Sequence, residues 1–465
     1  MYSKTITILA AVLAISACSF SGSSIRRSTP DRQGMNGAYL SLIDSAVNAS
    51  IADGEIPGAV VGVVRNGKLV YEKAFGNKAV YPEVEPMTVE TMFDLASVSK
   101  CVGTTLSVMQ LVEQGKLRLV DTVAHYIPGF LPWVNPDTGE RVPITVQHLL
   151  THSSGLEAYL PDVNAYLEEF GPGTPDSLMM VISTRIQRCF RPGTRQLYSC
   201  LNFITLQNIL ERITGERLCD YAQKNVFDAL GLKHTCYFPL ALDGGVFPLA
   251  NKKADARGNT PAIPATEEDD RLSGTSAPKF VTAAEEGNGF CGTSALKLVT
   301  ENPLASEVAP TEMQENGSVL RGQVHDPTAR LINLGNSGNA GVFSNVEDLA
   351  VICATLLGNG SFQGRRILSP LTVRRMFEVP QGNAPRVARA LGWDCYYLEP
   401  YTSGDVFPVT SIRGHTGYTG TSIILDPETD TAVIVLAHRV HPHDEGSTSR
   451  LRSIIASVVA ASIGR

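Results

Sequence analysis

The stretch that decides the fold reads Phe93-Asp94-Leu95-Ala96-Ser97-Val98-Ser99-Lys100-Cys101-Val102. The residues that follow it are apolar on nearly every side, as far as Gly115. Such a run predicts a helix buried at the centre of the molecule, because a surface helix would carry a polar face. We expect this helix to begin at Ser97.

Ser97 and Lys100 are spaced i and i+3, which places both side chains on one face of a helix. A serine hydroxyl is a poor nucleophile until a base takes its proton. A buried lysine loses its charge easily, so Lys100 can be that base near neutral pH. The free N–H groups of a first helical turn also favour developing negative charge. The pair therefore predicts an acyl-transferring serine hydrolase.

The Ser-x-x-Lys pattern occurs three times, so the motif alone is a weak signal. The copy at Ser276 contains Pro278, which disfavours a helix. The copy at Ser294 opens a short apolar run that Asn302-Pro303 interrupts. We therefore expect the Ser97 copy alone to be placed for chemistry. Further along the chain, a phenol at Tyr198 and an imidazole at His415 can complete a proton path.

Taken together, these segments resemble the serine β-lactamase and penicillin-binding protein superfamily, and most closely its class C β-lactamase-like, esterase-like branch. The resemblance runs from about Ile56 to the C-terminus, with an unmatched stretch from about Val246 to Pro303. Besides the Ser97 segment, four stretches carry it: Ile144–Leu156, Pro192–Phe203, Arg321–Pro327 and Gly414–Thr421.

The resemblance implies a role for each matching residue. Ser97 would attack a carbonyl and form an acyl-enzyme, while Lys100 and Tyr198 share its proton and Tyr198 later activates water. His415 stands where many relatives carry lysine, facing the serine from the edge of a sheet. Without the resemblance, Tyr198 would be interpreted as a core tyrosine and His415 as a strand-edge histidine. The backbone N–H groups of Ser97 and Tyr418 would form the oxyanion hole, and the substrate-contacting set would include Thr416, Gly417 and Cys200.

Two positions depart from the pattern of β-lactam-hydrolysing relatives. Cys200 stands where they carry an asparagine that meets the substrate's amide, and a thiol makes only weak hydrogen bonds. Asn202 would replace that amide only with a backbone shift. His415 is a weaker, pH-dependent partner for a substrate carboxylate than lysine. Both departures favour an esterase, or a peptidase acting on cell-wall D-amino-acid peptides. A class C-type β-lactamase, a D-alanyl-D-alanine carboxypeptidase and a catalytically silent binder of cell-wall fragments remain alternatives.

The order of elements predicts an α/β fold in which an antiparallel sheet is flanked by N- and C-terminal helices. A helix is expected over 38–53, followed by a hairpin that turns at Asn66-Gly67, the preferred two-residue turn. Strands are expected over 421–425 and 432–436, and a closing helix over 448–463. A mainly helical lobe, about 101–343, is inserted between them. We also expect helices over 145–151, 201–214 and 219–229, and another capped by Ser344 with Glu347 three residues on.

Within the lobe, residues 246–303 are expected to form an insertion, because their composition buries little apolar surface. It is interpreted as a surface insertion or as a lid over the cleft.

The N-terminus predicts export. Lys4 precedes a short apolar stretch and small residues, as in a secretory signal peptide over 1–17. Ile15-Ser16-Ala17-Cys18 resembles a bacterial lipobox, which would make Cys18 the lipidated first residue of the mature protein. The alternative is an ordinary signal peptide. Residues 18–34 would then be a flexible tether, and 35–465 the catalytic domain. This places the protein in the bacterial cell envelope, anchored by lipid in the periplasm or on the outer surface.

Composition excludes some partners. The net charge of −7 comes without a basic stripe, which argues against nucleic acid. His438, His441 and His443 are interpreted as a polar loop rather than a metal site, since no matching ligand set occurs elsewhere. We therefore expect a monomer without metal or cofactor, acting on a small or peptidoglycan-derived acyl substrate.

Overall fold

The computed structural model describes residues 24–237, 307–381, 388–395 and 402–464. Four of the expected features lie outside these ranges: the signal segment, Cys18, the insertion at 246–303 and the Ser-x-x-Lys copies at Ser276 and Ser294.

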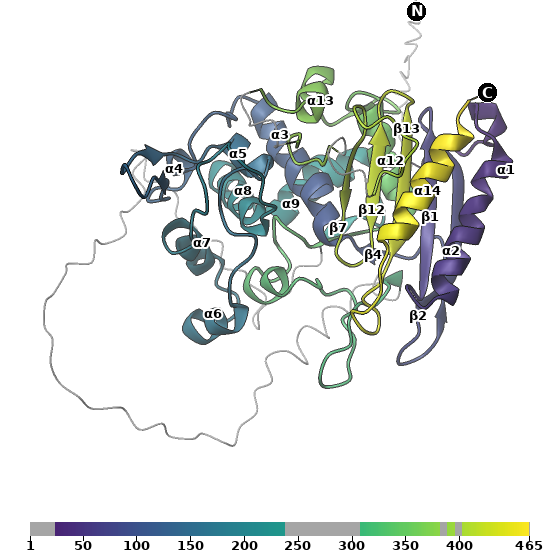
Figure 1. Cartoon of the computed structure of the whole chain (residues 1–465), viewed down its shortest axis with the longest axis horizontal. Coiled ribbons are helices and arrows are strands. Elements are labelled where there is room, and N and C mark those ends of the chain that lie inside the picture. The colour runs from purple at the N-terminus through teal and green to yellow at the C-terminus, as the bar shows by residue number, and fades with distance from the viewer. Residues whose placement is uncertain (1–23, 238–306, 382–387, 396–401, 465) are drawn as a thin grey trace, which may run out of the picture.

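The central feature is an antiparallel six-stranded sheet built from both ends of the chain (Figure 1). Its strand order is β11-β12-β13-β1-β2-β3. The strands are β1 Gly58–Arg65, β2 Lys68–Ala79, β3 Glu85–Pro86, β11 Arg413–Thr416, β12 Ser422–Asp426 and β13 Thr431–Ala437. Asn66 and Gly67 turn the β1–β2 hairpin with φ of 51° and 65°, as a type I′ turn requires. The hairpin and the two late strands are confirmed.

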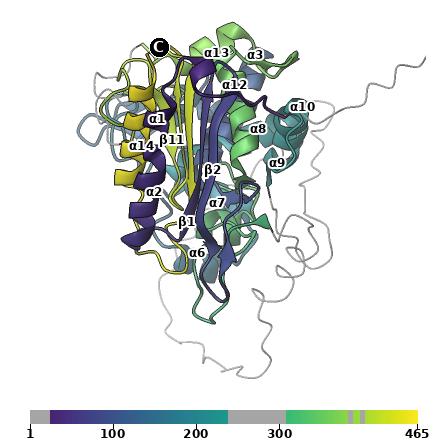
Figure 2. The same cartoon turned by 90° about the vertical axis from the view of Figure 1, so that its right-hand side faces the viewer.

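Strand β1 has cores on both sides, which explains its uninterrupted apolar sequence. Val61 and Val63 pack in the cluster that contains the terminal helices, whereas Val60 and Val64 belong to the larger core on the other side. The terminal helices are α1 Gly37–Leu40, α2 Leu42–Ala52 and α14 Ser449–Ser462. Figure 2 shows them side by side over one face of the sheet. The predicted flanking of the sheet by both termini is therefore confirmed.

The other face of the sheet carries α12 Val346–Leu357 and the helical lobe. Gly62 lets α12 approach β1, because a Cβ at this position would collide with Val346. The remaining helices are α3 Leu106–Glu113, α4 Val123–Tyr126, α5 Val146–Leu150, α6 Val163–Phe170, α7 Pro175–Thr184, α8 Cys200–Thr214, α9 Leu218–Ala222, α10 Asp228–Leu230 and α13 Pro370–Phe377. The short strands are β4 Phe93–Asp94, β5 Trp133–Val134, β6 Arg141–Val142, β7 Cys236–Tyr237, β8 Val342–Ser344, β9 Ser361–Phe362 and β10 Arg365–Arg366.

Two local predictions are wrong. The cap of α12 is Asn345, whose side chain accepts from the backbone N–H of Asp348, while Ser344 belongs to β8. The tether ends earlier than expected, because residues from Ser24 onward pack on the sheet. Ser28 N–H donates to the Leu69 carbonyl and Leu69 N–H donates to the Arg26 carbonyl, both at 3.0 Å. The edge of β2 is open there, since β3 pairs only with its far end.

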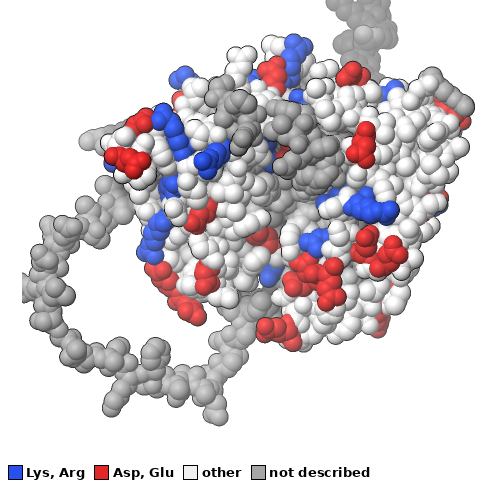
Figure 3. Space-filling model, in the orientation of Figure 1, with Lys and Arg blue, Asp and Glu red and all other residues white. Residues whose placement is uncertain are grey.

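Acidic and basic side chains are interspersed on the face shown in Figure 3, without a continuous basic stripe among the described residues.

Candidate active site

A cleft of about 1140 Å³ lies where the edge strand β11 meets the helical lobe. The predicted residues Ser97, Tyr198, His415, Thr416, Gly417 and Tyr418 all line it. Cys200 and Lys100 lie behind this lining, buried. The structure thus brings together every residue that the sequence singled out for chemistry within the described ranges.

Ser97 lies on a strained turn rather than at the start of a regular helix. It belongs to the 3₁₀ turn Ala96–Val98, which is followed by a π-helical segment, Lys100–Thr105, and then by α3. Ala96 adopts a φ of 45°, a conformation that alanine rarely takes. Asp94 holds this turn by accepting from the backbone N–H of Ala96 at 2.8 Å and of His325 at 2.7 Å. The expected regular first turn at Ser97 is therefore wrong.

Lys100 is fully buried and its amine is surrounded by acceptors. Nζ lies 3.0 Å from Ser97 Oγ, 2.9 Å from the Asn339 carbonyl oxygen and 3.4 Å from Cys200 Sγ. An ammonium has three N–H donors, so these three groups occupy all of them. A neutral amine would keep two of the contacts and offer its lone pair to the Ser97 proton. The predicted pairing of Lys100 with Ser97 is thus present at hydrogen-bond distance.

Tyr198 sits between aromatic rings and cations just before α8. Its ring stacks on His152, with centroids 4.4 Å apart and the planes inclined by 26°. Lys100 Nζ lies 4.9 Å and Arg389 Cζ 5.4 Å from its centroid. Burial raises the pKa of the Tyr198 hydroxyl well above its usual value, and nearby Ser97 and Arg389 oppose this rise. The hydroxyl has no aligned hydrogen-bond partner within the described ranges, although Ser97 lies close to it.

His415 is neutral in this site. Its Nε2 lies 3.0 Å from Arg389 Nη2, which can only donate, and its Nδ1 lies 2.8 Å from the Thr416 carbonyl oxygen, which can only accept. The ring proton must therefore be on Nδ1. Burial, and then Arg389 and Lys100, hold the pKa of His415 well below its usual range. The sequence predicts that His415 is a weaker partner for a substrate carboxylate than lysine, and the contacts of both its ring nitrogens give a physical reason for that weakness.

Arg389 is a site residue that the sequence did not reveal. It is 2% exposed, lines the cleft and forms an ion pair with Asp394. Asp394 in turn pairs through its backbone with Gly414 on β11. Arg389 thus supplies a permanent charge beside His415. It lies outside the segments that carry the family resemblance, and no motif around it would have indicated this position.

The loop after β11 is tied to the turn that carries Ser97. Thr419 Oγ1 donates to the Asp94 carbonyl at 2.8 Å, and Thr421 Oγ1 donates to the Leu95 carbonyl at 2.9 Å. Arg452 Nη2, from α14, donates to the carbonyls of Gly417 and Thr421 at 2.9 and 2.7 Å. These bonds bring the backbone of Tyr418 beside Ser97, where an oxyanion hole would have to form.

Cys200 is the first residue of α8 and lies against the Lys100 amine, so a thiol stands at the predicted position. Burial raises the pKa of Cys200. Asn202 does not replace the missing amide, because it is fully buried and turned into the lobe. Its Oδ1 accepts from Ser154 Oγ at 2.6 Å, and its Nδ2 lies 3.3 Å from His152 Nδ1.

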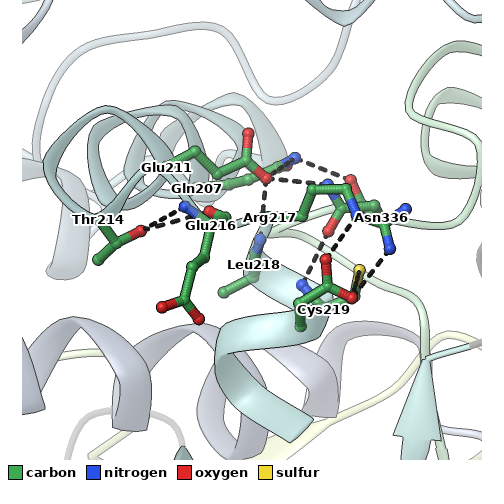
Figure 4. A network of polar contacts seen from close by, with 9 residues as sticks. Gln207, Glu211, Thr214, Glu216, Arg217, Leu218, Cys219 and Asn336 are labelled. Carbon is green, nitrogen blue, oxygen red and sulfur yellow. Dashed lines mark hydrogen bonds and ion pairs between the residues drawn. The ribbon is translucent and has the colours of Figure 1, made fainter. Parts of the chain in front are cut away.

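A second polar network holds the segment that contributes the Asn339 carbonyl (Figure 4). The buried carboxylate of Glu211 accepts from Asn336 Nδ2 at 2.8 Å and from the Leu218 N–H at 3.0 Å. Gln207 donates to the Asn336 carbonyl at 2.8 Å and accepts from the Gly338 N–H at 2.9 Å. Sequence reasoning missed this network, whose effect is to fix the carbonyl that Lys100 needs.

Comparison with known proteins supports the geometry. The family model described as Beta-lactamase matches residues 43–456. The chain is 28% identical to N-acetylmuramyl-L-alanine amidase of Bacillus subtilis (strain 168) over 420 residues, 86% of this chain and 81% of that protein. It is 26% identical to an Escherichia coli (strain K12) protein provisionally named a D-alanyl-D-alanine carboxypeptidase, over 94% and 91% of the two chains.

Among solved structures, EstCE1, a hydrolase with promiscuous acyltransferase activity, superposes with a TM-score of 0.60 at 23% identity. The match covers 91% of this chain and 99% of that one. At this identity the likeness establishes the fold.

The close approach at Gly417 generates a testable prediction. A Cβ there would collide with the Leu95 carbonyl and with Thr421 Oγ1, so Gly417→Ala must push the β11 loop away from the Ser97 turn. We expect ester turnover to fall at least about tenfold with a fold that remains intact, since displaced oxyanion donors cost ~10²-fold or more. Gly37→Ala is the matched control, because its nearest neighbour is a Pro30 carbon 3.9 Å away. Equal kcat in both variants would contradict the assignment of this loop.

Proposed function

Since the chain belongs to the β-lactamase family of serine hydrolases, we propose that it hydrolyses small esters and peptidoglycan-derived D-amino-acid peptides through an acyl-enzyme at Ser97. The observation that carries this proposal is the 3.0 Å contact between Lys100 Nζ and Ser97 Oγ, at the wall of a cleft large enough for a small acyl substrate.

The reaction begins with transfer of the Ser97 proton to the Lys100–Tyr198 pair as Oγ attacks the substrate carbonyl. The negative charge that develops on the carbonyl oxygen is stabilised by the backbone N–H groups of Ser97 and Tyr418. The pair then protonates the leaving group, which leaves the acyl group on Ser97. In the second half, the pair takes a proton from water through Tyr198, and the hydroxide formed attacks the acyl carbonyl. The bond to Ser97 Oγ then breaks, and the pair returns the proton to Oγ as the acid leaves. Because Lys100 and Tyr198 are coupled, the proton belongs to the pair rather than to either residue.

The substrate class follows from the two departures at the site. Cys200 offers a thiol where a β-lactam's side-chain amide would need an amide partner. Neutral His415 offers no charge to a β-lactam's carboxylate. An ester makes neither demand, and the names of relatives add D-alanyl peptides to the expected substrates.

The first prediction tests the nucleophile and its base. A fluorophosphonate should label the wild type at Ser97 and leave Ser97→Ala unlabelled, as peptide mapping can show. Lys100→Arg should lower turnover of p-nitrophenyl butyrate by at least ~10²-fold, because arginine cannot give up its proton. The matched control is Ser294→Ala, in another Ser-x-x-Lys copy. Label that persists in Ser97→Ala but disappears in Ser294→Ala would refute the proposal.

The second prediction concerns substrate preference. The wild type should turn over p-nitrophenyl butyrate readily and nitrocefin slowly or negligibly. Cys200→Asn should move the kcat/KM ratio toward nitrocefin, because the amide supplies the missing partner at the same position. Wild-type turnover of nitrocefin that equals or exceeds that of the ester would show that these two departures do not set the preference.

The location is a further part of the proposal. We propose that the mature protein is a monomer that begins at lipidated Cys18 in the bacterial envelope. The support is the lipobox-like sequence before Cys18, and the fact that one chain supplies every group of the site described above. Across the ranges that the structure describes, every helix is too short or too polar to cross a bilayer.

The corresponding prediction is made for the full-length chain expressed in a bacterium. Cys18→Ala should move the protein from the membrane fraction to the soluble fraction, measured by fractionation and immunoblot. Ser16→Ala, a small-for-small change inside the same segment, should stay with the membranes. Retention of Cys18→Ala on membranes would exclude lipid as the sole attachment.

A further inference from the structure

Arg389 is a buried charged side chain at the cleft whose position the catalytic scheme does not yet explain. Its guanidinium is 2% exposed and has three neighbours of different kinds: Asp394 across an ion pair, His415 at 3.0 Å and the ring of Tyr198 at 5.4 Å. Its Nε is buried without a hydrogen-bond partner within the described part of the chain. Burying a charged group away from water costs free energy, which points to a use for Arg389 in the site.

The backbone fixes Arg389 where it stands. The turn that follows it is closed by a bond from Ala390 N–H to the Trp393 carbonyl at 3.0 Å. Gly392 N–H donates to the Leu150 carbonyl at 2.9 Å, and Cys101 Sγ donates to the Gly392 carbonyl at 3.1 Å. Gly392 has a φ of 80° and lies so close to Thr105 that a Cβ would collide with it. The backbone of this turn is therefore held against the helical segment that follows Ser97.

We propose that Arg389 is a positioning residue whose permanent charge favours the deprotonated form of Tyr198 within the catalytic pair and keeps His415 as the neutral Nδ1–H tautomer. This inference rests on the function proposed above. A fixed positive charge beside a phenol favours loss of its proton. His415 cannot supply this charge, because its Nε2 must stay unprotonated to accept from Arg389.

The other groups around Tyr198 are consistent with this assignment. The Lys100 amine and the Arg389 guanidinium lie over its ring, and Asp394 is the nearby carboxylate whose charge opposes that of Arg389. The two histidines in ring contact with Tyr198 are neutral, since burial holds the pKa of both His152 and His415 well below the usual range. The groups that face it are Ser97, Lys100, His152, Cys200, Arg389, Asp394 and His415.

The experiment measures the acid limb of kcat/KM for p-nitrophenyl butyrate, a neutral ester, in the wild type and three variants. Arg389→Met should move the limb to higher pH by about one unit or more, as expected for loss of a unit charge at this range in a site of low polarity. Arg389→Lys should restore most of that shift, because it keeps the charge. Asp394→Asn should move the limb the opposite way, because it removes the opposing charge. A purely structural role would not produce opposite shifts.

A second readout needs no activity. In ¹⁵N-histidine NMR of the wild type, the His415 ring, assigned by its loss in His415→Gln, should remain the neutral Nδ1–H tautomer through pH 6. In Arg389→Met it should begin to titrate or change tautomer. If Arg389→Met folds poorly, the proposal is still tested by the acid limb of the Asp394→Asn profile and by the histidine spectrum of the wild type.

The outcomes separate the two proposals. An unmoved acid limb in Arg389→Met, beside Ser97-dependent turnover in the wild type, would overturn the role of Arg389 alone. If Arg389→Met changed only the KM of carboxylate-bearing esters, this role would also be overturned, because Arg389 would then be a substrate-binding residue. A wild type without Ser97-dependent turnover would overturn the proposed function and this inference with it, whereas the predicted opposite shifts would support both.

Discussion

The burial of the Lys100 amine is the constraint on which the rest of this structure depends. An amine removed from water must find acceptors, because an unsatisfied buried donor costs about 1–3 kcal/mol and a buried unpaired charge costs more. Here Ser97, Cys200 and Asn339 provide them. They come from the turn after β4, the start of α8 and the segment before β8, so one side chain joins the sheet side of the molecule to the lobe. The hydrogen bond between Glu211 and Asn336 belongs to a network that continues this connection away from the cleft (Figure 4).

The electrostatic balance of the site follows from the same burial. The Lys100 amine and the Arg389 guanidinium lie over the ring of Tyr198. Burial holds the pKa of both His152 and His415 well below the usual range, so both rings are neutral, and the hydrogen bonds of each agree with this. His152 Nδ1 accepts from the Ser199 N–H at 2.9 Å, and His415 Nε2 accepts from Arg389.

The sequence could predict what depends on local pattern. The Asn66-Gly67 hairpin, the late strands and the terminal helices each follow from periodicity and turn chemistry over a few residues. The contact between Lys100 and Ser97 follows from their spacing alone, and it survives although the helix there is π-helical rather than regular. Ser344 and Asn345 are both residue types that cap helices well. Ser344 is part of β8, where it pairs with Phe93, and the cap of α12 is therefore Asn345. That pairing is a tertiary event and leaves no local signal.

The residues that sequence reasoning missed share a physical reason, since each is brought to the site by contacts between segments that are far apart in the sequence. Arg389 arrives because Asp394 pairs with Gly414, and Asn339 arrives because its segment is bound to α8. Asn339 lies beside Lys100 and Arg389 lies beside His415, and neither contact displaces Lys100 from Ser97. Cys200 and His415 do not provide the contacts that would recognise a β-lactam's amide and carboxylate. A site can therefore lack the groups that recognise a β-lactam and still keep its catalytic base. The base needs a buried amine with acceptors and a fixed charge nearby, whereas recognition needs polar groups that point outward into the cleft. The described residues of this site direct their polar groups to the first requirement.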